Sequence, residues 1–475
     1  MKQIQHPSVE ERIAQGKTAR ESVAPGGHEG WRPAKDRPDP VALLEEQNKT
    51  REPDLVPVRH GRMMVSPFTF YRGAARIMAE DLEYTPTAGL DVQLCGDAHL
   101  SNFGLYASPE RALVFDLNDF DETLPGPFEY DVKRLAASFT IAARNNGFRK
   151  ADARAAALAS ANAYRMTMID YAAMPTLEIW YARVSDEDVL RALGTAMRST
   201  GGSGKKTAKK AEKVARKTTE KARTRDSLQA LSKLAEPVDG RYRIVNQPPI
   251  VVPLTEVAER VGIPADQLEG LIHEQFRAYR ATLRDDLGQL LERFQFVDAA
   301  RKVVGVGSVG TGAYIVLLQG RDQQDPLFLQ VKEATTSVLE NHLPKSRYER
   351  AGQRVVQGQR MMQAASDIFL GWTKGMREDR DLYWRQLRDM KGSAVVEEMV
   401  PESLNLYARL CGRTLARAHA RSGDPIALAA YLGKKDAFDQ SITDFAERYA
   451  DRNDRDYRAF TDAIRSGRLP VLEGV

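Results

Sequence analysis

The sequence of 475 residues contains only two cysteines, Cys95 and Cys411, and no long run of apolar side chains. Two cysteines cannot form a disulfide framework, which suits a reducing compartment. The longest strongly apolar run, near Tyr314–Leu318, is far shorter than the roughly 20 residues of a membrane-spanning helix. The first six residues are polar and lack the apolar segment of a secretory signal. We therefore expect a cytoplasmic protein without a membrane partner.

The sequence also has little excess charge of either sign. Its 69 Lys and Arg residues nearly balance 65 Asp and Glu residues, which gives a formal net charge of +4. A chain so close to neutrality does not bind nucleic acid through its overall charge. The 42% of hydrophobic residues supports a sizeable core, and the length exceeds one typical core, so we expect two lobes.

Positive charge is concentrated in one basic insert at residues 199–226, which follows the flexible-looking run Gly201–Gly204. Between Arg198 and Arg225 the chain holds eleven Lys or Arg residues and two Glu residues. Three interpretations remain open: a disordered linker, a solvated helix, or contact with a polyanion. Since no aromatic side chains are interleaved for base stacking, the polyanion receives the least weight, and we expect no nucleic-acid partner.

The main motif is Cys95–Asn102, which reads Cys-Gly-Asp-Ala-His-Leu-Ser-Asn and precedes a strand-like run ending on Asp116. An aspartate, an asparagine five positions later and a second aspartate after a strand form the pattern of a kinase catalytic centre. We predict that Asp97 accepts the proton of a hydroxyl group and that Asn102 and Asp116 bind Mg²⁺. The alternative role for Asp97 is to cap a turn, since Gly-Asp is a common turn pair.

Other acidic and histidine residues near this motif leave alternatives open. Asp119 and Asp121 can join the metal site or serve as turn residues. Asp131 can cap the helix that follows or brace the catalytic loop from below. The Gly-Asp-x-His sequence ending at His99 is also found in metallophosphoesterases, but the chain has no cluster of further histidine ligands. We expect His99 to orient the loop.

A glycine-rich segment far downstream contains Gly305, Gly307, Ser308 and Gly310 in the pattern G-x-G-x-x-G. Dinucleotide-binding folds and kinases share this pattern. A dinucleotide fingerprint opens a helix, whereas Tyr314–Leu318 is β-branched and aromatic and favours a strand. The segment therefore predicts a hairpin of the type that kinases place over the phosphates of ATP. The alternative to a phosphate-binding loop is a tight hairpin with a purely structural role.

Lys332 ends the predicted third strand of this region, after Leu327, Leu329 and Val331 on the other face. Kinases carry on this strand a lysine that contacts the α- and β-phosphates and pairs with a helix glutamate. Hairpin, strand and lysine occur in the order that a kinase requires. We name Glu349 as the partner glutamate, with Glu340 and Glu333 as alternatives.

The order of these motifs differs from that of an ordinary kinase, where the glycine loop and lysine precede the catalytic loop. Here they follow it by about two hundred residues, and Leu404–His419 predicts the helix that normally comes just before that loop. The simplest explanation is circular permutation, which is tolerated where termini lie close together. It requires that the acidic loop and Lys332 face each other across a cleft.

Five segments resemble the bacterial domain of unknown function 2252 family, and the similarity runs from about Arg59 to beyond Tyr449. They are Cys95–Gly104, Val306–Thr311, Leu329–Ala334, Arg385–Lys391 and Ala416–Asp424. The family is similar to aminoglycoside and choline phosphotransferases, whose loop reads His-Gly-Asp-Leu-His-x-x-Asn. The resemblance implies a kinase-like fold that binds ATP and Mg²⁺, but it carries no assigned reaction. Three positions depart from the kinase pattern: Cys95 for His, Leu117-Asn118 for Phe-Gly, and Gly312 for Val.

We therefore expect an α+β, two-lobed, protein-kinase-like fold with permuted connectivity. The expected parts are an N-terminal leader (1–58), a large helical lobe (59–294), a small β-rich lobe (295–398) and C-terminal helices (399–475). The expected function is an ATP- and Mg-dependent phosphotransferase acting on a hydroxyl of a small molecule or protein. AMP transfer (AMPylation) is the alternative, followed by a metallophosphoesterase and a non-catalytic nucleotide-binding regulator.

Overall fold

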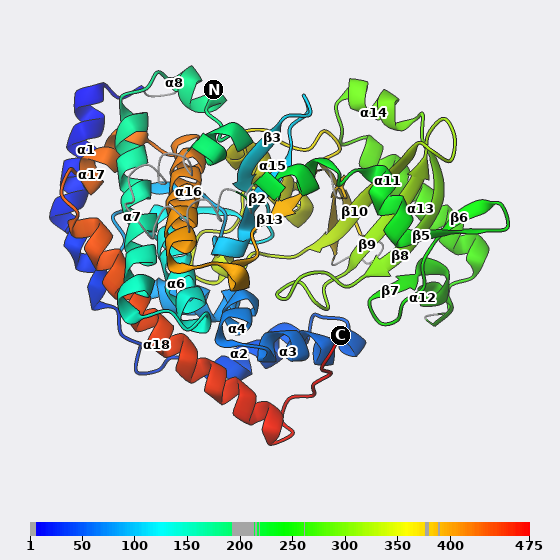
Figure 1. The fold of residues 1–475 in the computed structure, drawn as a ribbon, viewed down its shortest axis with the longest axis horizontal. Helices are drawn as coiled ribbons and strands as arrows, with labels where there is room; N and C mark the ends of the chain where they lie inside the picture. The colour runs from blue at the N-terminus through cyan, green and yellow to red at the C-terminus, as the bar shows by residue number, and fades with distance from the viewer. Residues whose placement is uncertain are drawn as a thin grey trace.

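The computed structural model describes residues 6–191, 213, 216–217, 219–260, 262–375, 380–387 and 390–475. Helices form 53% of the chain and strands 15%, so the predicted α+β class is confirmed. Figure 1 shows a part built mainly of helices beside a part built around a twisted sheet. Most of the basic insert lies outside the described residues.

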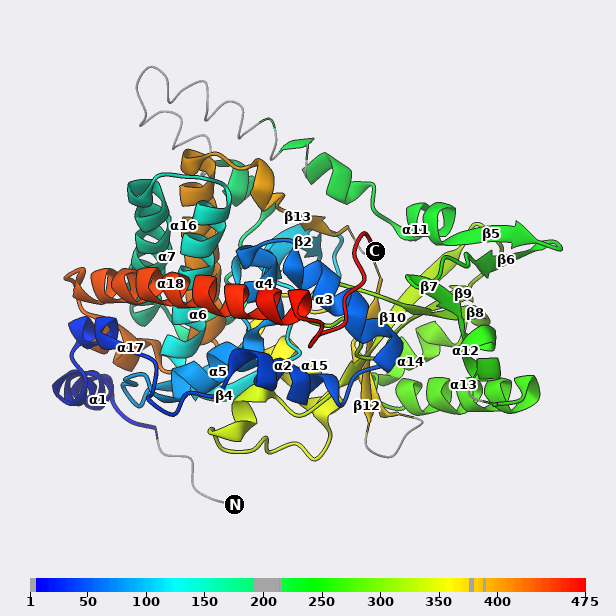
Figure 2. The same cartoon turned by 90° about the horizontal axis from the view of Figure 1, so that it is seen from below.

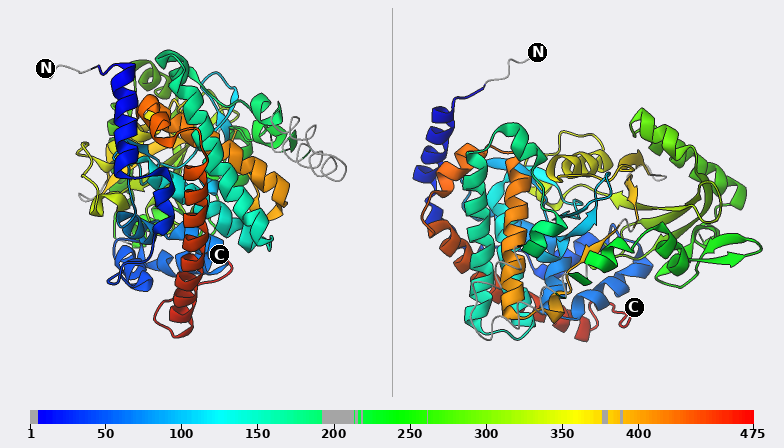
Figure 3. Two further views of the ribbon diagram at one scale, coloured as in Figure 1. Left: turned by 90° about the vertical axis from the view of Figure 1, so that its left-hand side faces the viewer. Right: turned by 45° about the horizontal axis from the view of Figure 1, so that its top comes forward.

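The helical part is built on α6 (Phe128–Asn145), α7 (Lys150–Ala172), α16 (Pro401–Ala420) and α18 (Ala437–Arg465). Small residues let these helices approach closely: a Cβ added at Gly412 of α16 would lie only 2.2 Å from the carbonyl oxygen of Ser160 on α7. The right-hand view of Figure 3 shows α7 and α16 side by side. Figure 2 shows α18 running across α6 and α7. The C-terminal helices thus pack in the same core as the central ones.

The other part contains a six-stranded antiparallel sheet in the order β11-β12-β10-β9-β8-β7. Its strands in chain order are β7 (Val251–Pro253), β8 (Gln295–Lys302), β9 (Ala313–Gln319), β10 (Pro326–Ala334), β11 (Gly371–Lys374) and β12 (Asp381–Gln386). The strand predicted after the glycines is β9, and the third predicted strand is β10. Helix α15 (Ala351–Met362) connects β10 to β11.

Helices cover both faces of this sheet, following the two-residue alternation of β9. Ile315 and Leu317 pack with α11 (Ser227–Leu234), whereas Val316 and Leu318 share a core with Tyr279 of α13 (Ala265–Arg280). The prediction assigned residues up to 294 to the large lobe. In the structure, helices within residues 227–291 pack against the sheet instead. They shield from water the apolar side chains that β9 and β10 carry on both faces of the sheet.

The N-terminal segment is built into the helical part and is more than a leader. The predicted short helix near residues 41–47 is α2 (Pro40–Asn48), but α1 (Val9–Ser22) was not predicted. Helix α1 has no apolar stripe and packs through Gly16 and Ala19 against α17 (Pro425–Leu432). Trp31 is buried between Phe445 and Tyr449 of α18.

Short strands in the helical part hold the acidic loop. β1 (Asp91–Leu94) pairs with β4 (Leu124–Pro127), and β2 (Phe103–Ala107) pairs with β3 (Leu113–Leu117) and with β13 (Gly392–Ser393). The strand pair β2 and β13 links the two parts, because β13 follows the sheet strand β12. No helix in the described part of the chain has the length and apolar character needed to cross a membrane.

The remaining elements complete the packing around these parts. They are α3 (Val56–Met64), α4 (Pro67–Gly73), α5 (Ala75–Glu83), α8 (Thr176–Tyr181), α12 (Leu254–Arg260), α14 (Asp285–Leu291), β5 (Ala235–Val238), β6 (Arg241–Ile244), η1 (Pro25–Gly30), η2 (Pro53–Leu55), η3 (Leu100–Asn102), η4 (Val338–Asn341) and η5 (Val396–Glu398).

Candidate active site

The loop that carries Asp97 joins β1 to β2 and is braced from inside the helical part. The backbone N–H groups of Cys95 and Gly96 donate to the two carboxylate oxygens of Asp131, at 2.7 and 3.0 Å. His419 of α16 contacts the same carboxylate at 3.2 Å. Of the two roles that the sequence left open for Asp131, the structure shows the contact with the loop, while the N-cap of α6 is Pro127.

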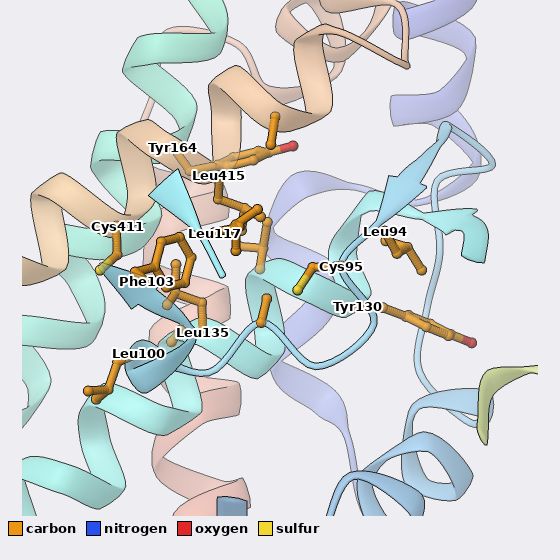
Figure 4. Packing of buried hydrophobic residues seen from close by; sticks show 14 of the residues in the cluster. Leu94, Cys95, Leu100, Phe103, Leu117, Tyr130, Leu135, Tyr164, Cys411 and Leu415 are labelled. Atoms are coloured by element: carbon orange, nitrogen blue, oxygen red, sulfur yellow. The ribbon is translucent and has the colours of Figure 1, made fainter. Parts of the chain in front are cut away.

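Apolar packing holds the rest of this loop in place. Figure 4 shows Cys95, Leu100 and Phe103 among Leu135 of α6 and Cys411 of α16. Gly96 has φ +84°, and a Cβ there would lie 2.2 Å from the carbonyl oxygen of Glu122. Only glycine avoids this clash while adopting a left-handed conformation. The backbone that presents Asp97 is therefore rigidly supported from below.

Asp97 has one occupied and one open carboxylate oxygen. The Nε and Nη2 atoms of Arg134 lie 2.7 and 2.6 Å from Oδ1. Among the described residues, the ionisable neighbour of Oδ2 is His99, whose Nε2 lies 3.7 Å away. Burial, followed by the charges of Arg134 and Arg72, lowers the pKa of His99 well below its usual value, so the ring is neutral. Arg134 therefore engages Oδ1 and leaves Oδ2 the less engaged oxygen of Asp97.

Asn102 is positioned beside this carboxylate by the backbone of the same loop. Its Nδ2 atom donates to the carbonyl oxygen of Asp97 at 2.6 Å, and its N–H donates to the carbonyl oxygen of His99 at 2.8 Å. With the amide nitrogen engaged in this way, the Oδ1 atom of Asn102 is the group available to a cation.

Asp116 differs from the prediction because both of its oxygens are used inside the protein. It is 1% exposed and forms a short ion pair with Arg417 of α16. The N–H groups of Leu117 and Ala364 donate to its two oxygens at 2.9 and 2.8 Å. Asp116 therefore ties β3 to α16 and to the segment after α15, and both of its oxygens already accept hydrogen bonds from within the protein.

Lys332 meets the acidic loop at the two aspartates that follow β3. Its ammonium lies 2.5 Å from Oδ2 of Asp121 and 3.5 Å from Oδ1 of Asp119. The hydroxyl of Tyr383 on β12 donates to Oδ1 of Asp121 at 2.5 Å. Two segments that lie far apart in the sequence thus face each other as the motif order requires. Sequence reasoning placed Asp119 and Asp121 only among the optional ligands.

The charges of this cluster act on one another. Burial and the neighbouring Asp121 raise the pKa of Asp119. Burial also opposes ionisation of Asp121, but Lys332 holds the pKa of Asp121 below its usual value. Burial alone would lower the pKa of Lys332, yet the two aspartates raise it. The guanidinium of Arg385 also favours ionisation of both carboxylates, and the side chain of Asp119 is 32% exposed.

Glu349 does not occupy the place predicted for the partner of Lys332. It is exposed and precedes the first turn of α15, which begins at Ala351. In the ranges described above, no ion pair joins Lys332 to Glu349, Glu340 or Glu333. Glu333 instead accepts the N–H of Gly312 at 2.9 Å, and Glu340 faces Arg354. The aspartates occupy the position beside Lys332 that the prediction gave to a glutamate.

The glycine-rich segment is the loop between antiparallel strands β8 and β9, as the hairpin prediction required. Gly305 and Gly310 have φ values of +65° and +86°. The hydroxyl of Ser308 lies 3.4 Å from Oδ2 of Asp121, so this loop covers the Lys332 cluster. The guanidinium of Arg51 donates to the carbonyl oxygen of Val309 at 2.5 Å.

Cations that were not predicted as site residues also face the cluster. Arg385 of β12 donates to the carbonyl oxygen of Asn118 at 3.0 Å. Burial, followed by the charge of Arg385, lowers the pKa of Lys391 to about 7, while Asp119 acts in the opposite direction. Lys391 is half-buried. The sequence could have indicated these two cations, because both belong to the segment Arg385–Lys391 that carries the family resemblance.

The residues that could hold a metal ion are few. Among the residues that the structure describes, no group of three or more His, Cys, Asp or Glu side chains is arranged to hold a metal ion by itself. The site offers Oδ1 of Asn102 and the carboxylate of Asp119.

Comparison with protein-family models shows to which family the chain belongs. The model of a bacterial family described as "Uncharacterized protein conserved in bacteria (DUF2252)" matches residues 51–463. The chain belongs to the DUF2252 family. The match includes the acidic loop, the glycine loop and Lys332. No curated protein and no solved structure gives a significant match.

Proposed function

We propose that this DUF2252 protein is an ATP- and Mg²⁺-dependent phosphotransferase that acts on a hydroxyl group. The observation that carries the proposal is the meeting of Lys332 with Asp119 and Asp121 beneath a glycine-rich hairpin. Kinases assemble the same parts, namely a hairpin over the phosphates, a lysine on the third strand and an aspartate that holds Mg²⁺.

The reaction assigns one task to each side chain. Oδ2 of Asp97 receives the hydroxyl proton while the hydroxyl oxygen bonds to the γ-phosphorus of ATP. The bond from that phosphorus to the bridging oxygen breaks, and ADP leaves. Lys332 holds phosphate oxygens, and Gly305, Gly307, Ser308 and Gly310 cover them. The open side of the Asp97 carboxylate supports its role, since Arg134 occupies only Oδ1.

Asn102 and Asp119 would hold Mg²⁺, with Asp119 taking the role that the sequence first suggested for Asp116. Mg²⁺ prefers a few protein oxygens and completes its shell with phosphates and water. An available amide oxygen and a partly exposed carboxylate suit this requirement. When bound, the ion would neutralise charge on the transferring phosphate.

Contacts between distant segments support the permuted kinase-like connectivity. Tyr407 of α16 donates to the carbonyl oxygens of Leu100 and Phe103, at 2.9 and 3.2 Å. Just after α16, the hydroxyl of Ser422 accepts the N–H of Gln93 on β1 at 2.9 Å. The end of α16 thus adjoins the strand that leads into the Asp97 loop, although these segments are more than three hundred positions apart. An unpermuted kinase joins such a helix to that loop directly.

The test is turnover of ATP labelled at the γ- or α-phosphate in the presence of Mg²⁺ and a panel of hydroxyl compounds and proteins. We expect γ-label on the acceptor and release of ADP. Transfer of α-label would identify AMP transfer instead. Asp97→Asn keeps an oxygen for Arg134, so it should fold and bind nucleotide, yet lose on the order of 10²–10⁴ in rate. Wild-type turnover by Asp97→Asn would refute the role of Asp97.

A further inference from the structure

The glycine loop between β8 and β9 is fastened to residues 51–62 of the helical part, which we call the anchoring segment. The guanidinium of Arg62 on α3 donates to the carbonyl oxygen of Gly305 at 2.7 Å. The guanidinium of Arg51 donates to the carbonyl oxygen of Val309 at 2.5 Å. These bonds join residues that are 243 and 258 positions apart in the chain. Two arginines of the helical part thus hold the two ends of the glycine-rich loop.

Further contacts strengthen this attachment. The N–H group of Glu52 donates to the carbonyl oxygen of Gly310 at 2.7 Å. Asp54 pairs at 2.8 Å with Arg301 of β8, the strand that leads into the loop. A buried apolar cluster spans both sides of the contact and contains Leu55, Val58, Val303 and Val309. Figure 2 shows α3 where the helical part meets the sheet. The loop is therefore docked on the helical part and is not a free hairpin tip.

These bonds leave the loop with spare hydrogen-bond donors. Three of its carbonyl oxygens accept from the anchoring segment. Those of Val306 and Ser308 accept the N–H groups of Val309 and Thr311, at 3.3 and 3.2 Å. Within the described chain, the loop N–H groups that donate to no protein acceptor are those of Gly305, Val306, Gly307, Ser308 and Gly310. Successive backbone N–H groups in this state attract an anion.

A glycine-rich loop does not keep such a conformation by itself. Glycine loses more conformational freedom on ordering than any other residue, and a loop that is ordered only when its ligand binds lowers the affinity. Contacts made before the ligand arrives remove that cost. Gly305 and Gly310, which both have positive φ, are among the residues whose carbonyl oxygens are held.

We infer that Arg51 and Arg62 are positioning residues that keep the glycine loop in the conformation that binds the phosphates of ATP. Each acts through the backbone of the loop and not through contact with the nucleotide. This inference rests on the proposed phosphotransfer, because that function supplies the phosphates. It adds that the nucleotide site of the sheet-containing part is incomplete without a segment of the helical part.

The direct test is calorimetric titration of a non-hydrolysable ATP analogue with Mg²⁺ into the full-length protein. We expect the double variant Arg51→Gln/Arg62→Gln to bind it about tenfold more weakly than wild type. Arg62→Gln alone removes a solvent-exposed bond, so it should fold and lose about threefold. The double lysine variant should recover part of the affinity, because lysine keeps a charged donor at each position.

The matched control is Arg360→Gln, because Arg360 of α15 likewise donates to one backbone carbonyl oxygen, that of Leu370, at 2.6 Å. It should bind the analogue as wild type does. Equal affinity in wild type and the folded double glutamine variant, or an equal loss in Arg360→Gln, would overturn the inference. In turnover assays the KM for ATP should rise more than kcat falls. A fall in kcat with KM unchanged would also overturn it.

Hydrogen exchange without nucleotide, read by mass spectrometry, tests the anchoring itself. The amides of Glu52, Val309 and Thr311 are hydrogen-bonded in the anchored loop. Peptides that contain these amides should exchange about threefold faster or more in the double glutamine variant, whereas Arg360→Gln should match wild type. Unchanged exchange in these peptides would refute the anchoring role.

The two proposals fail in different ways. If wild type binds no ATP analogue, the phosphotransferase proposal fails and the positioning role falls with it. If wild type binds the analogue and the double glutamine variant binds it equally well, the nucleotide site stands and only the positioning role of Arg51 and Arg62 is refuted.

Discussion

The ammonium of Lys332 lies 2.5 Å from the carboxylate of Asp121, although 211 positions separate the two residues in the chain. This contact joins the sheet-containing part to the loop after β3. Tyr383 adds a second bond from the sheet to the same carboxylate. The acidic loop and the glycine hairpin are thereby brought into contact, as the proposed phosphotransfer requires.

Asp116 and Asp119 should respond differently to the same substitution. Asp116→Asn leaves the guanidinium of Arg417 buried without its countercharge, so the free energy of unfolding should fall by about 3–5 kcal/mol. Asp119→Asn relieves repulsion with Asp121 and should change stability by about 1 kcal/mol or less, while turnover falls about 10²-fold. Denaturant unfolding and ATP turnover measure the two effects. Equal loss of stability in both variants would contradict the assignment.

Asp131 should matter for both stability and catalysis because it supports the loop from below. Asp131→Ala removes the acceptor of the Cys95 and Gly96 N–H groups, each a bond worth about 1.5–3 kcal/mol to a charged partner. We expect a lower unfolding free energy and a kcat reduced more than the affinity for ATP, since Asp97 loses its position and Lys332 does not. Tyr407→Phe, which removes bonds to the far end of the loop, should have a smaller effect in the same direction.

The affinity for ATP·Mg²⁺ should decrease as the pH rises above about 7. Burial and Arg385 lower the pKa of Lys391 to about 7, so this amine is largely neutral at pH 9 and charged at pH 6. Phosphate oxygens favour the charged form, so nucleotide binding should take up a proton and weaken by up to about tenfold per pH unit. Calorimetry in buffers of different ionisation enthalpy measures this uptake.

Lys391→Met provides the control for this pH dependence. The variant should bind ATP·Mg²⁺ with an affinity that no longer declines between pH 7 and 9. An unchanged pH profile would show that another group titrates. Linkage also predicts that Lys391 makes the free wild-type protein gain stability as pH rises from about 7 to 10.5, because the unfolded chain keeps its proton up to the ordinary pKa of 10.5.

Local patterns were sufficient to predict part of this structure. β-Branched and aromatic residues indicated β9, and alternating apolar residues indicated β10 and placed Lys332 on it. The predicted helix at Leu404–His419 lies within α16. The residues of the Asp97 loop were also identified in advance, because their spacing is itself the signal. These features depend on neighbours in the sequence.

The differences between prediction and structure concern residues whose contacts depend on distant partners. Asp116 lies in the apolar strand β3 and Asp119 comes just after it. Nothing local reveals that Arg417, 301 positions away, pairs with Asp116. Helix α1 lacks an apolar stripe because it packs backbone to backbone against α17, where a Cβ at Gly16 would lie 2.2 Å from the carbonyl oxygen of Ala427. Glu349 was assigned by its spacing from Lys332, but the helix begins two residues after it.

The most direct experiment is calorimetric titration of ATP into wild type, Lys332→Met and Lys332→Arg, each with and without Mg²⁺. We expect wild type to bind ATP in a Mg²⁺-dependent manner, Lys332→Met to lose this binding, and Lys332→Arg to retain part of it because the positive charge remains beside Asp119 and Asp121. Circular dichroism and thermal unfolding would establish that each variant is folded. Absence of ATP binding in wild type, or equal affinity in folded Lys332→Met, would contradict a phosphotransferase site at this position.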